Sequence, residues 1–332
     1  MTTKFTFSTR PLGIAALLLA TFSWGGMFLV SKGVLVHVSP AWFTLVRYGI
    51  SALVLLPLLA RRGPTVWHKL RANALGLSVR GFAGFGVFSI LLLTGLALSV
   101  PSHGAVIVAT VPMSTQMLRW VLDGIRPSRA TLLTSALALA GVVVVSGVLA
   151  STSSAEVSTW RGDLLVFGST LGWVWYTRGA ARYAELDVLE YTGMTVLASL
   201  PLLAIAALLF TSVGLAEVPH LADLEATWPS LLYVGAISSA VAVLAFNYGV
   251  RALGAVTATG FMNFVPVSVL LIGLVMGKLP TAAELAGMAM VVTALLIHTM
   301  ASRAVSAAAP APKPHGEPFS AGGMKAPHKI AG

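Results

Sequence analysis

Long apolar runs, separated by short polar segments, recur along the whole chain. Each run approaches the roughly 20 residues that a helix needs to cross the hydrocarbon core of a bilayer. The runs lack the alternation of apolar and polar residues that marks a strand, and only helices or closed barrels satisfy their backbone groups in lipid. The pattern therefore predicts ten transmembrane helices, with approximate bounds 11–34, 40–60, 80–99, 102–122, 131–150, 162–183, 190–210, 230–250, 254–277 and 283–302.

Two stretches of similar sequence indicate an internal duplication. Residues 95–114, GLALSVPSHGAVIVATVPMS, align without a gap with residues 249–268, GVRALGAVTATGFMNFVPVS. A glycine opens each stretch and Val-Pro-x-Ser closes each. Because five helices in the first half is an odd number, the second half must start from the opposite side of the membrane, as in many secondary transporters. We therefore expect an all-α membrane protein built from two five-helix inverted repeats, over residues 11–150 and 151–302.

Composition supports a protein embedded in lipid. The chain is 57% hydrophobic and 10% charged, whereas a soluble domain is about 45–50% apolar and about 25% charged. The absence of cysteine excludes disulfides and thiolate metal sites. The formal net charge of +10 does not point to nucleic acid, because the basic residues lie in short loops and tails rather than in one patch. Membrane topology explains them better.

The distribution of Lys and Arg predicts the orientation. With ten helices and a cytoplasmic N-terminus, the outer segments contain only Lys32, Arg161 and Lys278, and nearly all other basic residues fall inside. We expect a multi-pass protein of the inner (plasma) membrane with both termini in the cytoplasm. Residues 1–10 would form a cytoplasmic N-terminal tail, and the Ala/Pro/Gly-rich residues 303–332 a disordered cytoplasmic tail.

Several short motifs, in order, resemble the drug/metabolite transporter superfamily, specifically the EamA-type transporters. The residues that carry the resemblance are Trp24 and Phe28, Arg47-Tyr48, Pro112, Gly141-Val142-Val143, Gly162-Asp163, Trp173, Tyr176 and Pro266. The chain departs from the family pattern at Asp123-Gly124 and Gly277-Lys278, where such proteins often carry a Gly-Glu pair. The resemblance implies a secondary transporter that works by alternating access. It also implies export of small organic metabolites, amino-acid-like compounds or drugs.

The recurring prolines are candidate gate hinges. Proline has no backbone N–H, so Pro112 and Pro266 each free the carbonyl of the residue four positions earlier. Freed carbonyls and a kink can line a cavity or allow a gate to bend. The alternative is a packing kink, which neighbouring membrane helices tolerate.

Arg47 is the formal charge that the pattern places well inside a span. A guanidinium at that depth snorkels, pairs or faces a wet cavity. Its bidentate donor geometry suits a carboxylate on a solute. A structural contact with helix-end carbonyls is an equally good interpretation.

Uncharged polar and aromatic residues complete the candidate substrate-binding set. Amides inside spans usually join helices, but one beside the second proline could also contact substrate. Aromatic side chains near the start of each repeat could line a pocket or belong to the interfacial belt. The candidates, beside Arg47, are Trp24, Phe28, Gln116, Trp173, Tyr176, Asn247 and Asn263.

The sequence lacks the motifs of the main competing functions. It contains no GxxxxGK[ST] phosphate loop and no HExxH pattern, so we expect no cofactor, no metal and no enzymatic activity. An intramembrane enzyme would have to use Ser114, His103 and Arg47, without a carboxylate to orient the histidine. A non-transporting membrane scaffold is the third class. Asp163 and Glu284 are interpreted as helix N-terminal residues.

The expected partners are a small-molecule substrate and the lipid bilayer. The small-residue-rich helices 131–150 and 283–302 carry no intramembrane charge. We therefore expect them to make packing or homodimer contacts.

Overall fold

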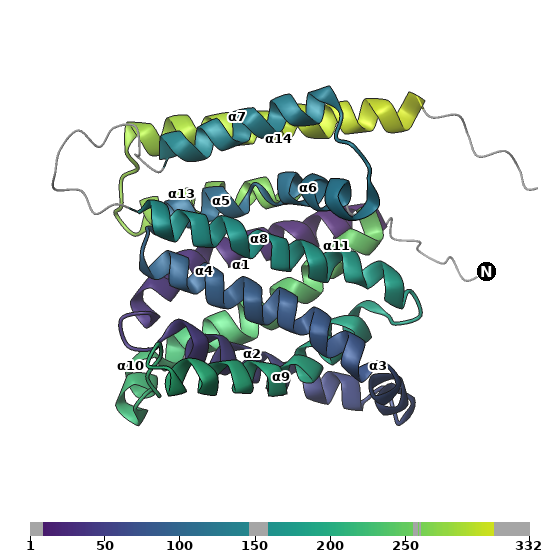
Figure 1. The fold of residues 1–332 in the computed structure, drawn as a ribbon, viewed down its shortest axis with the longest axis vertical. Helices are drawn as coiled ribbons and strands as arrows, with labels where there is room; N and C mark the ends of the chain where they lie inside the picture. The colour runs from purple at the N-terminus through teal and green to yellow at the C-terminus, as the bar shows by residue number, and fades with distance from the viewer. Residues whose placement is uncertain (1–8, 146–158, 255–257, 259, 309–332) are drawn as a thin grey trace, which may run out of the picture.

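A computed structural model describes residues 9–145, 159–254, 258 and 260–308, and every element in these ranges is a helix (Figure 1). The predicted all-α class is confirmed. The first half contains α1 (Thr9–Val34), α2 (Pro40–Ala60), α3 (Thr65–Gly81), η1 (Phe82–Val87), α4 (Phe88–Ala97), α5 (Pro101–Val108), α6 (Val111–Asp123) and α7 (Arg129–Val145). The second half contains α8 (Trp160–Gly179), η2 (Ala180–Tyr183), α9 (Val188–Ser212), α10 (Leu221–Leu232), η3 (Tyr233–Val241), α11 (Ala242–Leu253), η4 (Phe261–Asn263), α13 (Phe264–Val275) and α14 (Ala282–Ala308).

Two helices are longer than the sequence pattern predicts. One helix runs without a break from Thr65 to Ala97 and another from Leu221 to Leu253, so the predicted starts at residues 80 and 230 are wrong. Each contains a π-helical segment, η1 or η3, between its two α-helical parts. Their first turns are rich in polar residues, which a hydropathy pattern reads as loop although they continue the helix. The tail predicted from residue 303 falls partly in α14, which continues to Ala308, and its remainder lies outside the described residues.

Within the described ranges, five helices are long and apolar enough to cross a membrane. The number is six if α5 and α6, which meet at a bend of 44°, count as one broken span. The ten predicted spans are therefore not established by length and composition. Helix α8 contains Arg161 and Asp163 besides several hydroxyl side chains, which lowers its hydropathy.

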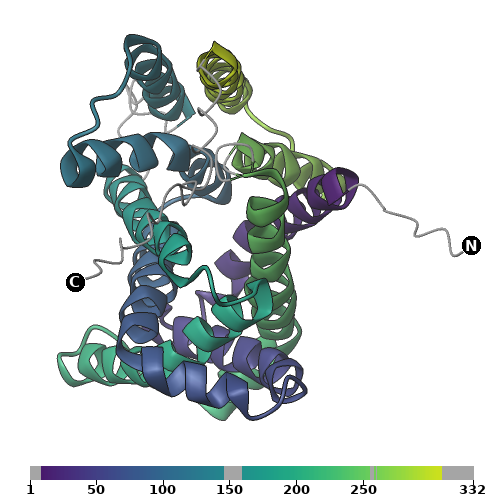
Figure 2. The ribbon, with the colours of Figure 1, turned by 90° about the vertical axis from the view of Figure 1, so that its right-hand side faces the viewer.

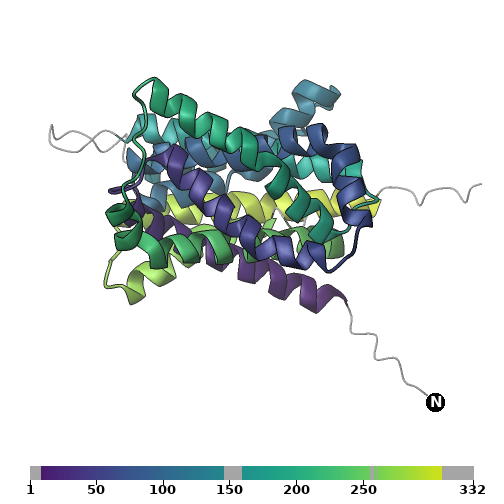
Figure 3. The ribbon, with the colours of Figure 1, turned by 90° about the horizontal axis from the view of Figure 1, so that it is seen from below.

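The two halves of the chain interlock. Helix α4 of the first half packs against α8 of the second, and α11 packs against α1 in the same way (Figure 2). Helices α2 and α9 lie side by side and cover the face that is at the bottom of Figure 1 and nearest the viewer in Figure 3. The core is thus formed between the halves rather than inside each.

Glycines allow the cross-packed helices to approach closely. A Cβ atom on Gly95 would lie 2.5 Å from the carbonyl oxygen of Gly162 and 2.7 Å from the Val166 side chain. A Cβ atom on Gly249, which the sequence aligns with Gly95, would lie 2.4 Å from the Leu17 side chain. Small residues at helix contacts are the usual device for tight packing in membranes.

The aligned serines also make corresponding contacts. Ser114 Oγ lies 2.6 Å from Thr170 Oγ1 in α8, and Ser268 Oγ donates to the carbonyl of Thr21 in α1 at 3.1 Å. Ser114 therefore joins α6, in the fourth predicted span, to α8, the first helix of the second half. Ser268 joins α13, in the ninth predicted span, to α1, the first helix of the first half. These contacts support the duplication that the sequence predicts.

Helices α7 and α14 form a separate pair along one side of the molecule (Figure 1). A Cβ atom on Gly141 would lie 2.7 Å from the carbonyl oxygen of Gly287. This close contact agrees with the packing role expected for these helices; the homodimer contact stays a prediction.

Candidate functional site

A helix break lies beside the centre of the molecule. Helix α5 ends at Val108 and α6 begins at Val111, with Pro112 in the first turn of α6. Pro266 likewise lies in the first turn of α13, after η4. Both prolines stand where a helix begins, so a missing N–H costs little. The chain bends by 44° at the break before Pro112, and the hinge role of the two prolines stays a prediction.

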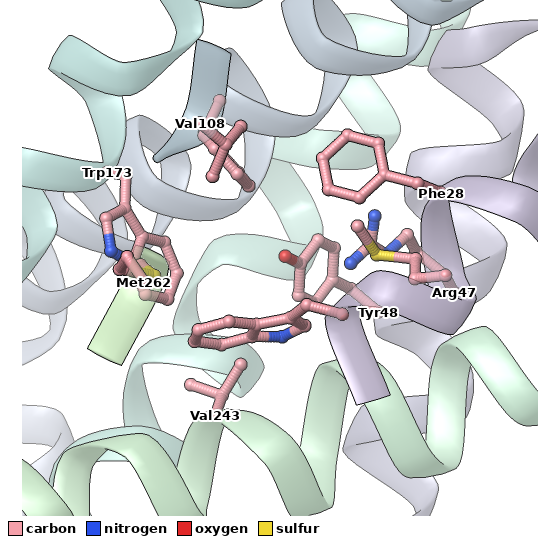
Figure 4. A pocket seen from close by; sticks show the side chains of 10 residues that line it. Phe28, Arg47, Tyr48, Val108, Trp173, Val243 and Met262 are labelled. Atoms are coloured by element: carbon pink, nitrogen blue, oxygen red, sulfur yellow. The ribbon is translucent and has the colours of Figure 1, made fainter. Parts of the chain in front are cut away.

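A narrow pocket lies between the halves (Figure 4). Phe28 and Tyr48 lie beside the Arg47 head group at one side of the pocket, and Trp173 and Met262 lie at the opposite side. The pocket has a cavity volume of about 20 Å³, roughly the space that one water molecule requires. The full lining is Trp24, Met27, Phe28, Arg47, Tyr48, Phe88, Val108, Trp173, Val243 and Met262. We call it the central pocket.

Arg47 is almost completely buried, with 2% of the residue exposed. Its Nε donates to Ser239 Oγ at 2.9 Å, and its guanidinium carbon lies 4.9 Å from the centre of the Tyr48 ring. Its Nη1 is buried without a hydrogen-bond partner. No carboxylate of the described residues forms an ion pair with it. A buried charge is costly unless it is paired, so the pocket contains an unneutralised cation.

The two predicted tryptophans meet edge to face, with ring centres 5.5 Å apart. Trp24 is 8% exposed and Trp173 is 3% exposed, so neither belongs to an interfacial belt. Trp24 Nε1 donates to the carbonyl of Ser238 at 3.0 Å, whereas Trp173 Nε1 is buried without a partner. Arg47 and Trp173, two residues of the pocket lining, thus each carry a buried donor without a partner.

A larger cavity adjoins the central pocket. Its lining includes residues of α6 and of the C-terminal part of α8, and these helices can be followed towards the right-hand side of Figure 1. Val108, at the end of α5, and Trp173 line the central pocket, whereas Val111, at the start of α6, and Val174, the next residue along α8, line the larger one. Its volume is about 930 Å³, within the range of small-molecule sites. Its charged lining is Arg80, Arg119, Asp123, Arg178, Arg182 and Arg251. We call this cavity the basic vestibule.

The predicted site residues divide between these features. Trp24, Phe28, Arg47 and Trp173 line the central pocket, whereas Gln116 and Pro112 line the basic vestibule. The sequence did not single out Met27, Phe88, Val108, Val243 or Met262, because apolar residues in an apolar span carry no distinguishing signal.

The remaining candidates lie outside both cavities or their side chains are not described. Asn247 Nδ2 donates to Tyr176 Oη at 3.0 Å and to Thr192 Oγ1 at 2.8 Å, so these residues tie α8, α9 and α11 together. Pro266 is buried in α13. The backbone of Asn263 ends η4, but its side chain lies outside the described part of the chain.

A polar cluster at the opposite end joins five helices: α1, α4, α5, α8 and α14. Ser99 donates to Asp163 at 2.5 Å, Asp163 lies 3.4 Å from His103 Nδ1, and Ser102 donates to Glu284. Lys32 donates to carbonyls at the C-terminal end of α4. The expectation that no carboxylate accompanies His103 is therefore wrong, because the fold brings α8 against the start of α5.

The residues of the competing enzyme hypothesis are not assembled. Ser114 contacts Thr170, whereas His103 contacts Asp163. Thr170 and Asp163 lie two turns apart on α8, about 10 Å along the helix axis. His103 is therefore not placed to act as a base for Ser114.

Comparisons with known proteins agree with this architecture. The sequence model of the EamA-like transporter family matches residues 11–147 and again residues 160–300. The uncharacterized transporter YrdR of Bacillus subtilis (strain 168) is 28% identical over 303 residues, covering 88% of this chain and 92% of YrdR. The uncharacterized transporter YyaM of the same organism is 26% identical over 280 residues, covering 82% of this chain and 88% of YyaM.

One solved crystal structure has a similar fold, with a TM-score of 0.63 and 21% sequence identity, over 90% of this chain and 98% of the other. The double family match, the transporter relatives and the apolar helices identify a multi-pass membrane transport protein. The chain belongs to the EamA-like transporter family.

Proposed function

We propose that this protein moves small organic solutes carrying an anionic group across the membrane, by alternating access and without ATP. The solutes would be metabolites, amino-acid-like compounds or drugs, and the net direction would be export. The central pocket is the proposed binding site, with Arg47 as its charged contact and with Trp24, Phe28 and Trp173 as its aromatic walls.

The unpaired guanidinium of Arg47 carries this proposal. An isolated buried cation is expensive in a membrane protein and usually marks a substrate or ion pathway. Arg47 keeps one buried donor free and has no carboxylate partner among the described residues. A carboxylate on the solute would accept from that donor and neutralise the charge. Trp173, which also lines the pocket, has a buried indole N–H without a partner.

The size of the central pocket favours a gated mechanism. At about 20 Å³ it does not hold an organic molecule in this conformation, so binding requires the walls to separate. The break between α5 and α6 separates the central pocket from the basic vestibule. We propose that the halves bend during transport at this break and at η4, the short helix that leads into α13.

The proposed topology keeps ten spans in two inverted five-helix repeats, over residues 11–150 and 151–302, with both termini in the cytoplasm. The two family matches and the corresponding serine and glycine contacts support it.

The experiment begins with a panel of carboxylate metabolites and their uncharged methyl esters. A bound ligand raises the thermal unfolding midpoint of the purified protein, and a hit that requires the free carboxylate is then tested for transport in proteoliposomes. We expect Arg47→Gln to abolish that transport. Arg61→Gln, which removes an exposed arginine outside both cavities, is the matched control.

A further inference from the structure

We propose that the basic vestibule is a second anion-binding site, which takes soluble organic anions carrying carboxylate or phosphate groups before they reach the central pocket. The place of this site in the transport route rests on the proposed function. The existence of the site does not, because it follows from the residues of the vestibule alone.

The charge of the vestibule is strongly unbalanced. Five arginines line it and Asp123 is its single acidic lining residue. Asp123 is already bound by Arg178, through two hydrogen bonds of 2.6 and 2.8 Å. In the part of the chain that the structure describes, the other four arginines form no ion pair. Arg119 also interacts electrostatically with Asp123, and Arg251 donates to the carbonyl of Leu186, but five arginines against one carboxylate leave the lining with a net positive charge.

Arg80 occupies a built position rather than a solvated one. It is only 9% exposed, and its guanidinium carbon lies 5.6 Å from the Tyr183 ring centre and 6.0 Å from that of Trp175. A Cβ atom on Gly179 would lie 2.4 Å from its Nη1, so the absence of a side chain on α8 makes room for the guanidinium. Aromatic rings hold the head group in place without neutralising its charge.

Membrane topology alone does not require this arrangement. The preference for basic residues on the cytoplasmic side is met by exposed residues in loops, whereas Arg80 is buried in a cavity wall. A cavity of about 930 Å³ with several unpaired guanidinium groups can concentrate anions, because low-dielectric walls focus the field of like charges. The carboxylate that Arg47 is proposed to bind belongs to the same class of ligand.

Because the chain contains no cysteine, a single introduced thiol can report the electrostatic potential inside the vestibule. Ala181 is exposed and lines the vestibule, so Ala181→Cys places one thiol there. We would compare its modification rates with an anionic and a cationic methanethiosulfonate reagent of similar size, each calibrated on a free thiol. The protein would be the full chain in uncharged-lipid nanodiscs. We expect the anionic reagent to be favoured, and citrate to slow its reaction.

Charge removal identifies the source of the effect. The double change Arg119→Gln, Arg182→Gln should reduce the anionic-to-cationic rate ratio by about tenfold at low salt and weaken protection by citrate. Arg80→Gln should act in the same direction, while Arg61→Gln should leave both readouts unchanged. Arg119 is half-buried and Arg182 is exposed, so the double variant still tests the inference if the Arg80 variant does not fold.

Two results would overturn the inference. One is an unchanged rate ratio in the double variant; the other is protection by phosphatidylglycerol in the nanodisc but none by citrate, which would assign the site to a lipid headgroup. The proposed function is judged separately, because Arg47→Gln should abolish transport yet leave vestibule protection intact.

Discussion

At the scale of single residues, the two halves use equivalent tryptophans differently. Trp24 Nε1 donates to the carbonyl of Ser238 in η3, whereas Trp173 Nε1 is buried without a partner. The first indole therefore contributes a hydrogen bond to the fold, and the second does not. Arg47 shows the same contrast within one side chain: its Nε donates to Ser239 Oγ, whereas its Nη1 has no partner.

This difference predicts unequal effects of the same substitution. Trp24→Phe should lower the free energy of unfolding by about 0.5–1.5 kcal/mol more than Trp173→Phe, because only the first removes a formed hydrogen bond. Thermal or denaturant unfolding of the purified variants measures the difference. Equal losses in both variants would show that the Ser238 contact does not stabilise the fold.

At the scale of elements, glycine contacts set the distance between the cross-packed helices. Gly95 and Gly162 approach so closely that a methyl group on Gly95 would lie 2.5 Å from a backbone oxygen. Neither helix can yield without moving its neighbours, because α8 also packs against η1 and α6, and α4 also packs against α2.

Gly95→Ala should therefore destabilise the protein by about 1–3 kcal/mol, the usual cost of overpacking. Gly168→Ala is the matched control, because it lies on α8 with open space around its Cβ position. That change should be neutral or stabilise slightly, since alanine favours helix over glycine. The comparison is made by thermal unfolding, and equal effects of the two substitutions would contradict the packing argument.

At the scale of the whole molecule, the sequence predicted the helical class, the pairing of the halves and four residues of the central pocket. These features leave strong marks: long apolar runs, a repeated Val-Pro-x-Ser, and an arginine and tryptophans in otherwise apolar spans. The starts of the helices at Thr65 and Leu221 leave no such mark, because polar turns of a helix resemble a loop. The contact between His103 and Asp163 depends on how distant helices pack, which no local pattern encodes.

The proposed topology predicts opposite exposure of two loops. Glu217→Cys, before α10, should react with a membrane-impermeant maleimide in intact cells, and Ser128→Cys, between α6 and α7, only after permeabilisation. Both positions are exposed in the structure, and the native chain contains no cysteine to react. Labelling of Ser128→Cys but not Glu217→Cys in intact cells would show that the orientation is reversed. Labelling of both in intact cells would contradict the ten-span count.

The central claim is that the buried charge of Arg47 binds the anionic group of a transported solute. Its most direct measurement is proteoliposome transport of a carboxylate ligand found by the thermal panel, compared between the wild type, Arg47→Gln and Arg61→Gln at matched amounts of folded protein. The account predicts loss of transport in Arg47→Gln alone, with no transport of the methyl ester by any of the three. Undiminished carboxylate transport by a folded Arg47→Gln protein would contradict it.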